Sequence, residues 1–243
     1  MQMNEIRPTA GLVDEVRVAM NPWRILDSAR VPGTREKLSL CIRSGVFSLR
    51  LGDDELMNSR SPGSERILGR IACERLAGRP RPRVLIGGLG MGFTLAAALE
   101  RLGPGARVIV AELVPAVLRW NRGRIAALAG SPLEDRRVTV LEGDVAELLR
   151  RNRRTYDAVL LDIDNGPVSF TRRGNGWLYS SAGLAAARES LRPAGVLAVW
   201  SASPDRPFAK RLREAGFQVE DLEILVSPHR QAMNTIWIAC RPA

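Results

Sequence analysis

The sequence has very little histidine and cysteine, and each shortage excludes a class of chemistry. His229 is the only histidine in 243 residues, so a two-histidine zinc site is excluded and a Ser-His-Asp triad would have to use this residue. The three cysteines, Cys41, Cys73 and Cys240, are odd in number and widely spaced, which predicts neither a CxxC metal site nor a disulfide framework. We therefore expect no bound metal and a reducing compartment.

Long uncharged runs are also missing. The longest, Val84 to Leu99, spans 16 residues and contains four glycines, so it is too short and too interrupted to cross a membrane. The N-terminus carries Glu5 and lacks the apolar segment of a signal peptide. These features predict a cytoplasmic protein that does not enter a membrane.

Lysine is scarce as well. Only Lys37 and Lys210 among the 36 basic residues are lysine, so the net charge of +10 rests on arginine. Such a surface attracts anions, so nucleic acid, a phosphorylated substrate and simple solubility are all compatible with it. The arginines are spread along the chain, however, and no cluster of aromatic and basic residues accompanies them. This pattern disfavours nucleic acid, because single strands stack on aromatic side chains beside basic groups. We expect a small-molecule acceptor as partner, and a homodimer stays open.

From residue 83 onward, short apolar runs alternate with longer segments of helical periodicity, which is typical of βα units around a parallel sheet. We expect a Rossmann-like, doubly wound α/β fold whose sheet is mostly parallel and ends in an antiparallel C-terminal edge hairpin. The expected strands are Val84–Gly87, Arg107–Ala111, Val138–Leu141, Ala158–Asp162, Val196–Trp200, Phe217–Val226 and Asn234–Ala239, and the expected helices are Thr94–Leu102, Pro115–Ala129, Val145–Arg150, Ser181–Leu191 and Arg206–Ala215.

The first 80 residues have a different pattern. Leu38–Arg43 and Val46–Leu51 alternate around Ser44-Gly45, which predicts a two-residue hairpin, and Ser64–Leu76 has helical periodicity. We therefore expect a small N-terminal β-hairpin element over residues 1–60, followed by the Rossmann-like domain over residues 61–243. No low-complexity linker separates the two parts, so they are expected to pack as one unit.

The strongest local signal is a strand that runs into glycines and then into a helix. Gly88, Gly90 and Gly92 alternate in a GxGxG pattern, which lets the backbone turn sharply and approach a ligand at a helix N-terminus. Phe93 stands where GxGxxG would need its last glycine, which weakens the interpretation as a pyrophosphate-binding loop. Glu112 ends the second strand of the expected fold, where a carboxylate can accept hydrogen bonds from both ribose hydroxyls of an adenosine.

Further carboxylates follow the next strands along the chain. Asp144 could accept a hydrogen bond from an adenine amino group, or it could be the N-cap of the helix that begins at Val145. Asp162 and Asp164 follow the fourth strand, where parallel topology directs them to the cleft beside the glycine loop, and a general base is expected there. Their alternative role is turn formation. The loop of residues 168–177 is either a lid over a substrate or a plain surface loop.

Over residues 38–240, these motifs resemble the class I S-adenosylmethionine-dependent methyltransferase superfamily, and more closely its spermidine synthase-like branch. That branch has a GGGDGG loop followed by Thr-Leu, which matches residues 88–93 and Thr94-Leu95, and a DSxDP-type motif whose first aspartate, the catalytic base, matches Asp162. Leu178-Tyr179-Ser180 resembles the segment that opens the next helix, and Glu65, in Gly63-Ser64-Glu65, falls where the family has a Tyr-His-Glu stretch. The resemblance implies a donor site for S-adenosylmethionine or its decarboxylated form at Gly88, Gly90, Gly92, Glu112, Asp144 and Val145, catalysis by Asp162 and Asp164, and acceptor binding by Glu65, Asn165 and Tyr179.

The sequence also departs from the spermidine synthase pattern. Met91 replaces the loop aspartate expected to hold the amine of a decarboxylated donor. Gly63 and Ser64 replace a tyrosine and a histidine, and the second acid of the DSxDP-type motif is displaced. We therefore expect an S-adenosylmethionine-dependent transferase that methylates a small molecule and does not prefer the decarboxylated donor. The alternative is an aminopropyltransferase that makes a polyamine, and an RNA methyltransferase or a non-catalytic binding protein ranks below both. His229 is expected to take no part in the chemistry.

Overall fold

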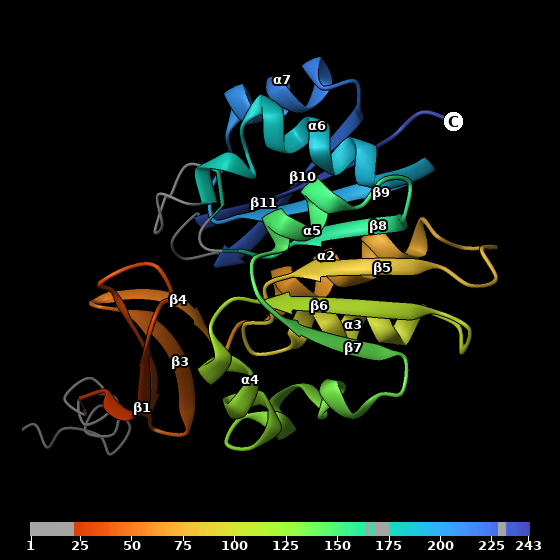
Figure 1. Cartoon of the computed structure of the whole chain (residues 1–243). Helices are drawn as coiled ribbons and strands as arrows, with labels where there is room; N and C mark the ends of the chain where they lie inside the picture. Colours follow the sequence, from red (N-terminus) through yellow and green to blue (C-terminus); the bar gives the residue numbers. More distant parts are fainter. Residues whose placement is uncertain (1–21, 164–165, 168–174, 228–231) are drawn as a thin grey trace, which may run out of the picture.

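The computed structural model describes residues 22–163, 166–167, 175–227 and 232–243. Two sheets organise this part of the chain, a four-stranded antiparallel sheet at the N-terminal side and a seven-stranded, mostly parallel sheet after it (Figure 1). The expected fold class is confirmed. None of the helices in the described ranges is long and apolar enough to span a membrane.

The N-terminal sheet has the order β1-β2-β3-β4. Its central hairpin was predicted, and its turn residues Ser44 and Gly45 both adopt positive φ, at 50° and 79°, as a two-residue hairpin turn requires. The two outer strands were not predicted, because they carry mixed polar sequences with no clear alternation. The four strands are β1 (Arg24–Arg30), β2 (Lys37–Arg43), β3 (Val46–Leu51) and β4 (Asp54–Asn58).

The central sheet has the order β10-β11-β9-β8-β5-β6-β7. The five strands β5 to β9 run parallel, whereas β11 pairs antiparallel with β9 and β10 pairs antiparallel with β11, so the predicted edge hairpin is confirmed. Their bounds are β5 (Arg83–Gly87), β6 (Arg107–Glu112), β7 (Val138–Glu142), β8 (Tyr156–Leu161), β9 (Leu191–Ser201), β10 (Gln218–Ser227) and β11 (Ala232–Cys240).

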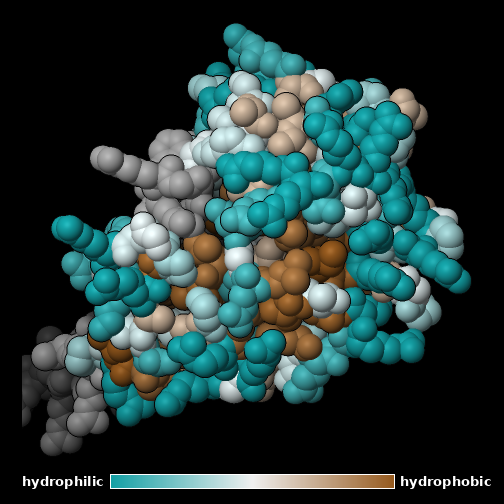
Figure 2. Space-filling model, in the orientation of Figure 1, coloured by the Kyte–Doolittle hydropathy of each residue, from teal (hydrophilic) through white to brown (hydrophobic). Residues whose placement is uncertain are grey.

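Successive side chains of a strand point to opposite faces of the sheet. Each face carries its own apolar core here, and helices cover both faces. Ile86 and Leu160 belong to the core shared with α2 (Gly63–Glu74), α3 (Phe93–Arg101) and α4 (Pro115–Arg122). Their neighbours Leu85 and Leu161 belong to the core shared with α5 (Val145–Arg151), α6 (Ser181–Ser190) and α7 (Arg206–Glu214). Figure 2 shows apolar side chains in the middle of one face. Leu141 on the edge strand β7 is one of the exposed large hydrophobic residues in the described ranges.

One predicted helix is shorter than expected. The segment after Pro115 was predicted to stay helical to Ala129, but α4 ends at Arg122 and only a 3-10 turn, η1 (Ala126–Ala129), follows. Gly123 interrupts the helix at φ −135° and ψ −100°, which lies outside the helical region. Two further 3-10 turns are η2 (Pro132–Glu134) and η3 (Asn175–Trp177).

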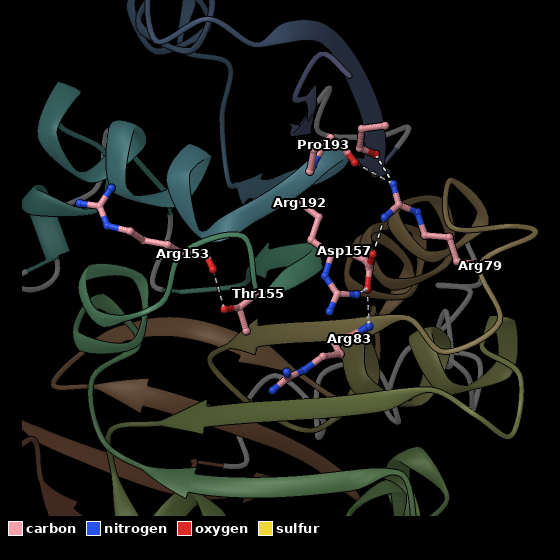
Figure 3. Close-up of polar contacts among 8 residues, drawn as sticks. Arg79, Arg83, Arg153, Thr155, Asp157, Arg192 and Pro193 are labelled. Carbon is pink, nitrogen blue, oxygen red and sulfur yellow. Dashed lines mark hydrogen bonds and ion pairs between the residues drawn. The ribbon is translucent and has the colours of Figure 1, made fainter.

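A buried ion cluster joins β8, β9 and the loop after α2, at the end of the strands opposite to the glycine loop. Asp157 has a side chain only 3% exposed, and it accepts hydrogen bonds from the guanidinium groups of Arg79 and Arg192 and from the backbone N–H of Arg83 (Figure 3). Arg79 also donates to the carbonyl oxygen of Ala194 at 2.8 Å. The cluster thus connects the start of β5 to its neighbours.

Candidate active site

A cavity of about 160 Å³ lies at the carboxyl ends of the parallel strands, where the N-terminal sheet faces them. This is the crevice in which doubly wound folds bind their ligands. One wall comes from the glycine loop and the ends of β6, β7 and β8, and the opposite wall comes from the N-terminal sheet. Residues from the N-terminal sheet and its loops that line the cavity are Val31, Glu36, Leu38, Leu49, Leu51, Leu56 and Met57.

The glycine loop borders the cavity with backbone in the left-handed region, which favours glycine. Gly88 has a φ of +85°, and a Cβ there would lie 2.2 Å from the carbonyl oxygen of Asp162. Gly90 has a φ of +54°, and a Cβ there would lie 2.7 Å from the sulfur of Met57. Both glycines line the cavity, whereas Gly92 does not: it is buried and forms the N-cap of α3.

Glu112 connects the loop to the strand ends. It is 7% exposed, its Oε2 accepts a hydrogen bond from the N–H of Leu89 at 2.9 Å, and its Oε1 accepts one from the N–H of Val114 at 2.8 Å. Glu112 thus holds the backbone on both sides of the strand end, and it also lines the cavity.

Asp144 and Val145 lie at the next strand end, beside Glu112. The Oδ1 of Asp144 accepts a hydrogen bond from the N–H of Ala146 at 2.8 Å, so the expected N-cap is present. Asp144 also lines the cavity together with Val145, and its other oxygen is the one that the N-cap bond does not use. The two roles weighed from the sequence are therefore compatible in one side chain.

Asp162 and Glu65 bring two carboxylates together across the cavity floor. The Oδ2 of Asp162 accepts a hydrogen bond from the Thr94 hydroxyl at 2.6 Å, and the Oε2 of Glu65 accepts one from the Ser64 hydroxyl at 2.7 Å. Burial and, secondarily, the negative charge of Glu65 raise the pKa of Asp162 to about 7, although the Thr94 hydrogen bond opposes this shift. Burial also raises the pKa of Glu65. A carboxylate with a pKa near 7 is suited to general-base chemistry.

The cavity is acidic although the chain as a whole carries a charge of +10. Five carboxylates line it, and none of its lining residues within the described ranges is an arginine or a lysine. The overall charge is therefore a poor guide to the ligand. In the described ranges, no three histidine, cysteine, aspartate or glutamate side chains lie close enough together to hold a metal ion. The five acidic residues are Glu36, Glu65, Glu112, Asp144 and Asp162.

Two residues singled out in the sequence lie away from the cavity. Tyr179 is 3% exposed, its hydroxyl donates to the carbonyl oxygen of Ile163 at 3.2 Å, and its ring packs edge-on against Phe208, so it supports the segment after β8. Met91 is completely buried in the core, and the loop position that faces the cavity is Gly90. The loop residue on which the expectation about the donor was based is therefore not part of the cavity lining.

Other predicted positions lie outside the described residues, namely Asp164, Asn165, His229 and most of the 168–177 loop. Conversely, the structure adds Thr94, Glu36, Met57 and Trp200 to the neighbourhood of the site. A threonine directly after a glycine loop is a weak signal that could have marked Thr94. Nothing in the local sequence marks the other three.

Comparison with known proteins supports the resemblance seen in the motifs. No family model matches the chain. Polyamine aminopropyltransferase 1 of Streptomyces coelicolor is 32% identical over 154 residues, which cover 60% of this chain and 28% of that protein. Two crystal structures, a spermidine synthase in complex with the transition state analogue AdoDATO and the spermidine synthase of Thermotoga maritima, each superpose with a TM-score of 0.71. In both cases the identity is 16%, over 90% of this chain and 72% of the other.

The chain has the spermidine synthase fold. A small antiparallel sheet followed by a seven-stranded Rossmann-like sheet is the shared architecture, and the cavity lies where these two sheets face each other. The chain spans less than a third of the length of the Streptomyces aminopropyltransferase. The spermidine synthase fold by itself leaves the reaction to be argued from the cavity.

Proposed function

We propose that this protein transfers an aminopropyl group from decarboxylated S-adenosylmethionine to a small amine. The observation that carries the proposal is the cavity itself, with five carboxylates and no described arginine or lysine in its lining. The decarboxylated donor has a sulfonium and an ammonium group, and the acceptor amine is a further cation. Such ligands gain favourable interactions in an anionic cavity that repels anions.

The described residues fit an adenosine-containing donor. Gly88 and Gly90 line the cavity with backbone alone, and Glu112 and Asp144 line it with carboxylates, which are suited to accept hydrogen bonds from ribose hydroxyls and an adenine amino group. The bound donor would supply an electrophilic carbon next to its sulfonium. For their part, Glu65 and Asp162 attract the acceptor's ammonium group, and Asp162 takes one of its protons so that a neutral amine can react.

Methyl transfer from S-adenosylmethionine is the less favoured reaction. That donor carries an additional carboxylate, which would enter a cavity already lined by five carboxylates. Our expectation that the decarboxylated donor has no advantage depended on Met91, which lies in the core. The similarity to a polyamine aminopropyltransferase also supports aminopropyl transfer.

Calorimetric titration of the full chain with three adenosyl compounds tests this proposal. We expect decarboxylated S-adenosylmethionine to bind at least about 10-fold more tightly than S-adenosylmethionine, because like charges in proximity cost several kcal/mol. Methylthioadenosine, which lacks both the ammonium and the carboxylate, serves as the reference. Equal or tighter binding of S-adenosylmethionine, together with a methylated product, would contradict aminopropyl transfer.

Replacing Glu112 by alanine should weaken binding of all three compounds. The substitution removes a carboxylate that accepts two backbone hydrogen bonds in the glycine loop and lines the cavity. We expect a loss of about 1–3 kcal/mol of binding free energy, measured by the same titration with methylthioadenosine. Glu142→Ala is the matched control, because Glu142 ends the neighbouring strand, pairs in register with Glu112 and is exposed outside the cavity. An unchanged dissociation constant in Glu112→Ala would exclude it from the donor site.

A further inference from the structure

Thr94 lies at the point where three elements meet beneath the cavity. It is the second residue of α3, it is 2% exposed, and its Oγ1 lies 2.6 Å from Oδ2 of Asp162 at the end of β8. The same Oγ1 lies 3.2 Å from the backbone carbonyl oxygen of Glu65 in α2. One hydroxyl group thus faces both a carboxylate and a carbonyl.

Close packing of α2 against α3 holds this arrangement in place. Gly69 of α2 lies directly against the first turn of α3, and a Cβ at that position would lie 2.4 Å from the carbonyl oxygen of Thr94. Any larger residue would therefore push the two helices apart. The short separation keeps the Glu65 carbonyl within reach of the Thr94 hydroxyl.

A hydroxyl has a single hydrogen and two lone pairs, so Thr94 can serve two states of its neighbour. While Asp162 is ionised, the Thr94 hydroxyl donates to the carboxylate. Once Asp162 is protonated, it can donate its own O–H to Oγ1, and the Thr94 hydrogen can turn to the Glu65 carbonyl oxygen. The buried polar groups then remain hydrogen-bonded in both states, which avoids the cost of an unsatisfied donor or acceptor.

We propose that Thr94 is a positioning residue for the base, keeping Asp162 hydrogen-bonded both before and after it takes a proton from the acceptor. In that step the proton leaves the acceptor's ammonium nitrogen, the electrons of the N–H bond remain as its lone pair, and an O–H bond forms on Asp162. This inference rests on the proposed function and adds to it a residue that makes no direct contact with the substrate.

The charges around Asp162 make the contribution of Thr94 measurable. The negative charge of Glu65 on α2 acts on Asp162, and the other carboxylates that line the cavity are Glu36, Glu112 and Asp144. Burial and the charge of Glu65 both raise the pKa of Asp162, whereas the Thr94 hydrogen bond lowers it. Removing this hydrogen bond should therefore raise the pKa of Asp162 further.

The test compares wild type with Thr94→Val and Thr94→Ser over a range of pH. In wild type, kcat/KM for a diamine such as 1,4-diaminobutane should rise with pH as Asp162 ionises near its pKa of about 7. In Thr94→Val the midpoint of this rise should move upward by about one to two pH units, the scale of a lost hydrogen bond to a charged group. Thr94→Ser keeps the hydroxyl and should restore the wild-type midpoint.

Thr235→Val is a matched control for the loss of a buried threonine hydroxyl. Thr235 is also 2% exposed, but no described residue forms a hydrogen bond with its Oγ1. The midpoint should therefore stay at the wild-type value in this variant. A Thr94→Val protein that loses activity or stability with an unmoved midpoint would show a merely structural role and overturn the inference.

A second readout separates this inference from the proposed function. The carboxyl ¹³C signals of selectively labelled aspartate can be titrated by NMR without any substrate, and Asp162→Asn assigns the signal of Asp162. An upward shift of its pKa in Thr94→Val, reversed in Thr94→Ser, supports the role of Thr94 even if no aminopropyl transfer is found. An unchanged pKa in Thr94→Val refutes it even if transfer is found.

Discussion

Asp162→Asn is expected to lower kcat by about 10²-fold or more, because the amide cannot take a proton from the acceptor. Asparagine has nearly the same shape as aspartate and can still accept the hydrogen bond from Thr94, which is 2.6 Å from Oδ2 in the structure. The donor's dissociation constant should therefore change far less than kcat. Steady-state kinetics with the decarboxylated donor, combined with calorimetric titration of that donor, measures both quantities.

The matched variant for this experiment is His229→Ala. His229 is the only histidine of the chain and hence its only side chain of the type whose ordinary pKa lies near neutral pH. We expect its removal to leave turnover within a few-fold of wild type, since its surroundings in the sequence are those of a turn. Turnover that survives Asp162→Asn and collapses in His229→Ala would reverse the assignment of the base.

Asp157→Ala is expected to lower the free energy of unfolding by about 3 kcal/mol. The alanine removes an almost fully buried carboxylate that binds two arginines and the N–H of Arg83, and it leaves that N–H without its acceptor. The loss should lie near the lower end of the range for broken buried ion pairs, because the side chains of Arg79 and Arg192 are 27% and 39% exposed and water can reach them. Urea denaturation followed by circular dichroism measures the change.

Glu189→Ala is the control for Asp157→Ala. Glu189 forms an ion pair with Arg153 at 2.7 Å, but both side chains are more than half exposed. Such a pair contributes at most about 1 kcal/mol, so the unfolding curve should move little. If the two variants had equal stability, the cluster around Asp157 would not be a stabilising element of the sheet.

Much of the fold follows from local patterns in the sequence. Buried parallel strands need continuous apolar runs, so segments such as 84–87 and 107–111 predicted β5 and β6 to within one residue. The early start of β9 at Leu191 was missed, because Arg192-Pro193-Ala194-Gly195 has the composition of a turn. Leu191 pairs with Tyr156 of β8, and such a pairing between residues distant in the sequence cannot be inferred from local composition.

The sequence alone placed Glu112, Asp144 and Asp162 at one edge of the sheet, because parallel strands direct their carboxyl ends to the same side. It could not show that Glu65 approaches Asp162, that Thr94 connects them, or that Met91 points into the core while Gly90 faces the cavity. These relations depend on how α2 packs against α3 and on the path of the glycine loop. Periodicity and spacing describe one element at a time, whereas the distance and burial that set the pKa of Asp162 exist only once the elements are packed together.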